Sequence, residues 1–193
     1  MKILRDQLEQ RVHVIHRLDR PTTGVLMFGR EHEPHAFKDL RMQFELKQVK
    51  KTYWAVVAAA PHSPSRDCSE PLQKEGAAPI EVAFTQFTCL AETQVNSHAF
   101  SLLEARPQIG RYHQIRRHLQ AANLPLVGDY RYAGLEESNR LGALFGSGTN
   151  MLLQARELQF HHPVTAETIT IEASVEPLIA AHFSPPFRSG TGS

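Results

Sequence analysis

The sequence is poor in cysteine, in aromatic residues and in long apolar runs, and each shortage excludes a class of protein. Its 193 residues include 2 cysteines, 1 tryptophan and 8% aromatic residues. Two cysteines, Cys68 and Cys89, cannot supply a disulfide framework or a zinc site of paired cysteines. No stretch reaches the roughly 18 consecutive apolar residues of a membrane helix, and residues 1–6 do not resemble a signal peptide. We therefore expect a cytoplasmic protein that does not enter a membrane.

Net charge is also small, so only the distribution of charge is informative. Lysine and arginine number 21 against 20 acidic residues, which gives a formal net charge of +1. The segment 106–118 contains four arginines and two histidines without one acidic residue. A second basic cluster precedes two aromatic residues: Lys47, Lys50, Lys51, Tyr53 and Trp54. Cations beside exposed aromatic faces favour RNA binding, although a solvated surface over core aromatics has the same composition.

The periodicity of apolar residues predicts a single α+β domain. Strand patterns occur at residues 23–30, 50–59, 80–90, 99–105, 152–160 and 168–173. Helical spacing occurs at residues 33–44, 111–122 and 176–183. The segment 61–79, rich in proline, serine and charge, is predicted to be a surface loop, and residues 184–193 a disordered tail. Long strands interleaved irregularly with a few helices are typical of an α+β domain, here residues 1–183.

The segment 16–24, HRLDRPTTG, is the first candidate for chemistry. Asp19 stands between Arg17 and Arg20 and is followed by a turn and an apolar strand. Catalytic groups favour such strand ends, because a rigid scaffold presents the side chain to a cleft. A neighbouring arginine would lower the pKa of the carboxyl and keep Asp19 ionised. The alternative is an aspartate that only stabilises the turn, and the spacing does not choose between the two.

The segment 106–119, RPQIGRYHQIRRHL, is the second candidate. The predicted helix 111–122 places three apolar residues on one face: Tyr112, Ile115 and Leu119. Arg116 lies next to that face and can be drawn inward, where it needs a carboxylate partner, and Asp19 is the natural one. Arg117 lies on another side and would meet phosphate. A basic surface helix without a site is the alternative interpretation.

Residues 16–24 resemble the active-site motif of the RluA-type pseudouridine synthases. Four further segments resemble motifs of that family and follow in its order: 51–57, 110–119, 125–132 and 152–163. The resemblance covers about residues 13–173. It implies a mixed, mostly antiparallel, bent sheet flanked by helices and loops, with the active site in a central cleft. It also implies a monomeric isomerase of RNA that converts uridine to pseudouridine without a cofactor or a metal.

The resemblance further implies roles for single residues. Asp19 would be the catalytic carboxylate, Tyr53 the aromatic residue that stacks on the base, and Arg116 the arginine paired with Asp19. Ile115 would line the pocket. Two neighbours would support the loop that positions the arginine: His113 and Gln114. The remaining candidates for substrate binding are basic: Arg17, Arg20, Lys51, Arg111 and Arg117.

The substrate and the completeness of the domain are less closely defined. The run Arg116-Arg117-His118 and the short chain most resemble the branch that modifies uridine 65 of transfer RNA, and a ribosomal RNA substrate is the alternative. Thr23 replaces the usual serine of the motif, while Tyr112 and Ile109 stand where threonine is common. The family's domain opens with a Lys-Pro-x-Gly strand that has no counterpart here, so we expect one strand to be missing. A catalytically impaired RNA-binding module is therefore the main rival.

Two other enzyme classes fit less well. His113 and Arg116 match the His-x-x-Arg spacing of tyrosine recombinases, but those enzymes need a nucleophilic tyrosine downstream and none follows Tyr132. A metal-dependent phosphohydrolase could draw on the 11 histidines. However, His113 and His118 are five residues apart and would not share a helix face.

Overall fold

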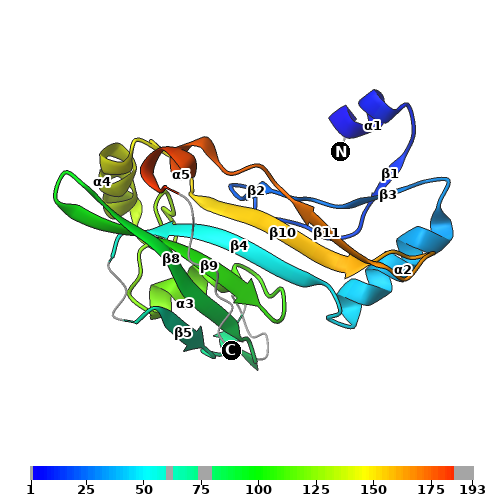
Figure 1. The fold of residues 1–193 in the computed structure, drawn as a ribbon, viewed down its shortest axis with the longest axis horizontal. Helices are drawn as coiled ribbons and strands as arrows, with labels where there is room; N and C mark the ends of the chain where they lie inside the picture. Colours follow the sequence, from blue (N-terminus) through cyan, green and yellow to red (C-terminus); the bar gives the residue numbers. More distant parts are fainter. Residues whose placement is uncertain (1, 60–62, 74–79, 185–193) are drawn as a thin grey trace.

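The computed structural model describes residues 2–59, 63–73 and 80–184, and a seven-stranded sheet forms its centre (Figure 1). The strand order is β11-β10-β4-β9-β8-β5, and β2 pairs with β10 in parallel whereas the other described neighbours are antiparallel. The strands are β2 (Thr23–Gly24), β4 (Lys50–Val57), β5 (Ser65–Cys68), β8 (Thr85–Val95), β9 (His98–Pro107), β10 (Leu153–His161) and β11 (Thr168–Glu172). Two short pairs lie outside this sheet: β1 (Val12–Val14) with β3 (Phe28–Arg30), and β6 (Leu72–Gln73) with β7 (Ile80–Glu81). The predicted mixed, mostly antiparallel sheet is confirmed.

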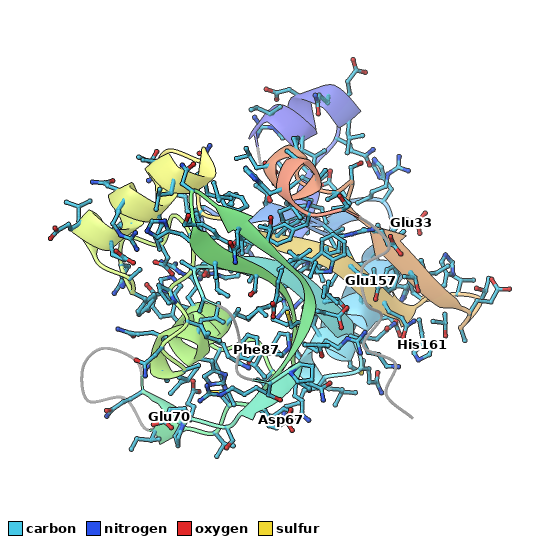
Figure 2. All side chains as sticks on the ribbon, turned by 60° about the vertical axis from the view of Figure 1, so that its left-hand side comes forward. Glu33, Asp67, Glu70, Phe87, Glu157 and His161 are labelled. Carbon is cyan, nitrogen blue, oxygen red and sulfur yellow. The ribbon has the colours of Figure 1, made fainter. Side chains whose placement is uncertain are left out.

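Different helices cover the two faces of the sheet. Alternate residues of β4 point to opposite faces, so Ala55 and Val57 pack toward α3 (Gln114–Ala121). Trp54 and Val56 belong to the second core, under α4 (Leu135–Phe145) and α5 (Pro177–His182). In Figure 1, α3 lies below β4, and α4 and α5 lie above it. Figure 2, in which Phe87 of β8 is labelled, shows β8 and β9 curving around the side on which α3 lies. The sheet is therefore bent, as expected.

Several elements lie where the sequence predicts them. Helix α2 (Pro34–Glu45) has its proline in the first turn, and α5 and the β10–β11 pair also match their predicted ranges. The predicted strand 23–30 is wrong in its middle. There the Val25 N–H donates to the Ala155 carbonyl at 2.9 Å, and the Met27 N–H donates to His16 Nε2 at 3.0 Å. The residues between β2 and β3 are therefore not part of a strand.

The prediction of a loop over 61–79 is also wrong in part, because β5 pairs with the edge of the sheet at β8. Three of the four residues of β5 are exposed, so an edge strand of this kind carries no apolar periodicity. Helices α1 (Lys2–Leu8) and α4 were not predicted. Residues 60–62, 74–79 and 185–193 lie outside the described residues, and with them most of the predicted tail. Within the described ranges, no helix is both long enough and apolar enough to cross a membrane.

Candidate active site

The two segments singled out in the sequence meet in one pocket of about 290 Å³. Its walls come from residues between 17 and 22, from the segment between 107 and 116, and from Lys51, Tyr53 and Leu153 on the central strands. The pocket therefore brings together residues nearly a hundred positions apart in the chain, as the pairing of Asp19 with Arg116 required.

Asp19 reaches this pocket from a tightly fixed turn. The Thr22 N–H donates to the Asp19 carbonyl at 2.9 Å, and β2 then pairs with β10. At Gly24 the backbone has φ +107°, and a Cβ there would lie 2.1 Å from the Ala155 carbonyl oxygen. Only glycine fits this close approach. The Asp19 side chain remains 25% exposed, so its carboxylate is accessible from the pocket.

Arg116 is buried as predicted, but its main partner is a residue that the sequence reasoning missed. Its Nε and Nη2 each donate to a carboxylate oxygen of Asp129 at 2.7 Å, whereas Nη1 lies 3.4 Å from Asp19 Oδ2. Asp129 is 1% exposed and also accepts the N–H groups of Arg131 and Tyr132. Asp129 thus holds the guanidinium, and the predicted approach to Asp19 uses the remaining nitrogen. A lone aspartate after glycine in the apolar segment 125–132 was the available signal.

Tyr53 and Ile115 form the aromatic and aliphatic walls. Tyr53 lies on the same face of β4 as Ala55 and lines the pocket. Burial, together with the nearby Asp19 carboxylate, raises the pKa of Tyr53 to about 12, so its phenol is protonated at neutral pH. Ile115 is 6% exposed and lines the pocket as predicted. Trp54, the other aromatic residue of the lysine-rich segment, is buried on the other face, which is the alternative of core aromatics under a solvated surface.

The start of α3 corrects the predicted helix 111–122. His113 has a left-handed backbone, φ 52°, so the helix begins at Gln114. Tyr112 therefore does not join the apolar face that holds Ile115. Instead it is 38% exposed, lines the pocket, and stacks on the His113 ring at 3.7 Å between centroids.

Gln114 and His113 fix the loop before α3. Gln114 Oε1 accepts the Arg111 N–H at 3.1 Å, and its Nε2 donates to the Phe84 carbonyl and to Thr85 Oγ1. His113 Nδ1 lies 2.9 Å from the Tyr132 hydroxyl, and Nε2 lies 3.8 Å from Asp19 Oδ1. These contacts hold the loop that leads into α3, and the role in positioning Arg116 that the resemblance implies for both residues stays a prediction.

The basic candidates divide into two groups. Arg17, Lys51 and Arg111 line the pocket, although Arg111 is already paired with Glu81 at 2.8 Å. Burial lowers the pKa of Lys51. The exposed Arg20 and the half-buried Arg117 do not line the pocket. The structure therefore brings some of the predicted substrate-binding residues to the pocket but not these two.

Three polar residues near the pocket have identifiable environments. His16 stacks on Phe44 at 4.7 Å, and burial followed by the charge of Lys51 lowers its pKa to about 4. His118 is fully buried between Thr85 Oγ1 and the Glu70 carbonyl. Thr22 Oγ1 is buried at the pocket without a hydrogen-bond partner in the described part of the chain, and the sequence reasoning overlooked it. Among the described residues, no group of three or more His, Cys, Asp or Glu side chains could hold a metal ion.

Comparison with known proteins gives this pocket a context. The sequence profile of the family described as RNA pseudouridylate synthase matches residues 1–121. The chain is 33% identical over 190 residues to tRNA pseudouridine synthase C of Pectobacterium carotovorum, which covers 90% of this chain but only 50% of that protein. It is 35% identical over 193 residues to the protein of the same name from Pasteurella multocida, with 91% of this chain and 78% of that protein covered. The chain thus spans from half to about three quarters of the length of these relatives.

Solved structures agree on the fold. Human RNA Pseudouridylate Synthase Domain Containing 1 superposes with a TM-score of 0.75 at 20% identity, covering 93% of this chain and 75% of that one. Human RNA Pseudouridylate Synthase Domain Containing 4 gives a TM-score of 0.70 at 22% identity, covering 93% of this chain and 77% of that one. The profile match extends over more than half of the chain. This chain belongs to the RNA pseudouridylate synthase family.

Proposed function

We propose that this chain isomerises uridine to pseudouridine in transfer RNA, at uridine 65, with the Asp19 carboxylate as the catalytic group. The observation that carries the proposal is the position of Asp19: a partly exposed carboxylate, 3.4 Å from the buried Arg116 guanidinium, in a pocket walled by Tyr53. The choice of transfer RNA rests on the names of the relatives. We also propose that the enzyme acts as a monomer in the cytoplasm and needs no cofactor.

The reaction fits a single carboxylate. The bond from C1′ to N1 breaks, the uracil turns, and C5 bonds to C1′. C5 then loses its proton and N1 takes one up, so neither electrons nor protons are gained or lost overall. Asp19 either attacks C1′ covalently or removes the C2′ proton to give a glycal-like intermediate. In both routes Arg116 stabilises the carboxylate in place, and its own position depends on Asp129.

Tyr53 and Ile115 would control the detached base. The Tyr53 ring offers a flat face for stacking, and Ile115 adds apolar surface that keeps water from the intermediate. Because the phenol is protonated, Tyr53 can accept the C5 proton only if its own proton moves on, and the neighbouring Asp19 carboxylate is the available acceptor. The target uridine must leave its helix to enter the pocket, at a cost of a few kcal/mol.

The test replaces the carboxylate by its isosteric amide. Asp19→Asn should release tritium from C5-labelled uridine in transfer RNA at least about 10³ times more slowly, because a positioned acid–base or nucleophilic group contributes on this scale. Affinity for the same RNA and the unfolding midpoint should stay close to those of the unmutated protein. Asp67→Asn, an exposed aspartate on β5 labelled in Figure 2, is the matched control.

Near-normal turnover by Asp19→Asn would refute the catalytic role. Tritium release from ribosomal RNA but not from transfer RNA would support the proposed reaction and would contradict the proposed substrate. Binding of RNA without any release by the unmutated protein would instead indicate a binding module. Mapping the product in transfer RNA then decides whether position 65 is the site.

A further inference from the structure

A second hollow, of about 570 Å³, adjoins the active-site pocket and shares Lys51 and Pro107 with it. It runs along the first residues of β4 toward the end of α2. We call it the lysine groove after three of its lining residues: Lys47, Lys50 and Lys51. Glu157 of β10 also lines the groove, and Figure 2 shows it with His161 on the part of β10 that lies beside α2.

Lys51 stands where the pocket and the groove meet. A Cβ placed on Gly110, in the pocket wall, would lie 3.3 Å from Lys51 Nζ, so the ammonium is at the pocket end. Its surroundings are partly dehydrated, and no carboxylate of the described residues lies within 4.0 Å of Nζ. An ammonium removed from water without a counter-ion is unfavourable. The geometry therefore suits an anion that arrives with the ligand.

Lys47 is held at the far end of the groove by an unusual backbone. It follows α2 with φ 60°, a left-handed position that favours glycine. Two hydrogen bonds fix it there, from the Gln48 N–H to the Gln43 carbonyl at 2.9 Å and from the Lys47 N–H to the Phe44 carbonyl at 3.2 Å. The Gln43 amide in turn bonds both backbone groups of His161 on β10, at 2.8 and 2.9 Å. A lysine thus occupies a rigid site at which glycine would be less strained.

The acidic residues nearby do not neutralise the three lysines. Arg106 also lines the groove, but Glu104 pairs with it at 3.0 Å. The Glu157 carboxylate accepts a hydrogen bond from the Thr52 hydroxyl at 3.4 Å. Neither of these two carboxylates lies within 4.0 Å of the ammonium group of a groove lysine. The groove consequently keeps an excess of positive charge.

We propose that the lysine groove binds the sugar–phosphate backbone of the RNA strand next to the uridine in the pocket. Lys51 contacts the phosphate nearest the reacting nucleotide, and Lys50 and Lys47 contact phosphates farther along. This inference rests on the proposed function and adds the path of the strand. Phosphate contacts carry no sequence information, so the groove sets affinity and register rather than the choice of base.

Equilibrium binding over a range of salt concentrations tests the groove. A fluorescent transfer RNA transcript is titrated with Asp19→Asn protein, alone or with Lys50→Gln, Lys47→Gly or the control Lys38→Gln. Lys38 is an exposed lysine of α2 outside the groove. Each groove variant should bind roughly five- to ten-fold more weakly near 0.15 M salt and lower the salt slope by about 0.7–0.9. Lys47→Gly should also raise the melting temperature, because it relieves the left-handed backbone.

The outcomes separate this inference from the proposed function. Groove variants that bind as Lys38→Gln does, in a protein whose unmutated form releases tritium, overturn the groove alone. An unmutated protein that neither binds transfer RNA nor releases tritium overturns both. A loss of affinity for Lys47→Gly together with a higher melting temperature supports the groove, because a purely structural lysine would not give opposite changes.

Discussion

The two faces of the central sheet differ in the side chains that they bury. Under α4 and α5 the largest fully buried residues are apolar, among them Phe100, Phe145 and Phe183. The face that carries α3 buries polar groups as well: Thr85, Gln114, Arg116 and His118. Buried polar groups need partners, and each of these four has a hydrogen bond to another part of the chain.

This difference indicates that one face mainly stabilises the fold and the other positions the groups around Asp19. The apolar face contributes packing that any well-fitting hydrocarbon could supply, whereas the α3 face fixes the direction of charges around Asp19. We therefore expect changes on the apolar face to alter the free energy of unfolding alone. Changes on the α3 face should alter catalysis, and in some cases stability too.

The largest combined effect is expected for Asp129→Ala. Removing this carboxylate leaves the buried Arg116 with the 3.4 Å contact to Asp19 as its remaining ion pair among the described residues. Removing one partner of a buried ion pair lowers the unfolding free energy by about 3–5 kcal/mol. The displaced guanidinium should also lower kcat by roughly 10²-fold while KM stays nearly constant. Urea unfolding and tritium release measure the two effects.

The matched control for Asp129→Ala is Glu137→Gln, which lies near the other side of Arg116 and pairs with Arg140 on the surface of α4. It should change neither quantity appreciably. If Asp129→Ala keeps its kcat although it loses stability, then Asp129 is a structural residue and does not position Arg116 for the reaction.

On the opposite face, Phe100→Ala should lower the unfolding free energy by about 3–5 kcal/mol. Phe100 is fully buried and packs on Phe145 with 5.0 Å between ring centroids. Tritium release per folded molecule should be unchanged at 25 °C, because the site lies across the sheet. Leu135→Ala, at a 68% exposed position of α4, is the control and should have almost no effect. A fall in kcat of folded Phe100→Ala would show that the two faces are coupled.

Lowering the pH should destabilise the side of the protein that carries α3, by somewhat less than the two substitutions above. Burial lowers the pKa values of His16, His113 and His118, all on or beside the α3 face, and that of His16 to about 4. Because the folded pKa lies below the unfolded 6.5, the contribution of neutral His16 is complete above pH 6.5 and is lost as the pH falls toward 4. The loss should reach about 3 kcal/mol, at roughly 1.4 kcal/mol for each pKa unit.

Calorimetry at pH 7.5 and pH 5 measures about 2 kcal/mol of this loss, because the loss is complete only below the folded pKa of about 4. His16→Gln keeps an acceptor for the Met27 N–H but cannot take up a proton, so its melting temperature should fall less on acidification. An equal fall in both proteins would assign the acid sensitivity to other groups.

The sequence predicted elements whose periodicity reflects burial, and it failed where tertiary contacts override local pattern. Strand β4 and the β10–β11 pair have clear apolar patterns and were located correctly. By contrast, the helix begins at Gln114 and not at residue 111, because His113 has a left-handed backbone and its ring contacts Tyr132, which no local spacing reveals. Edge strand β5 is placed by its pairing with β8, which its own mostly exposed residues do not predict.

The site shows the same division. Asp19, Tyr53 and Arg116 could be placed together from motifs, and the pocket does contain all three. The dependence of Arg116 on Asp129 was missed, because Asp129 is thirteen positions farther along the chain and lies in a turn. Arg20 and Arg117 carry the expected charge, yet charge alone does not determine which side chain enters a pocket.

The pairing of β2 with β10 has a consequence for synthesis of the protein. Thr23 and Gly24, which follow the Asp19 turn, pair with Gln154 and Ala155, about 130 residues later. A chain growing on the ribosome at roughly 5–20 residues per second therefore makes Asp19 long before the strand that seats it. The pocket around Asp19 should therefore be completed only after β10 has emerged from the exit tunnel.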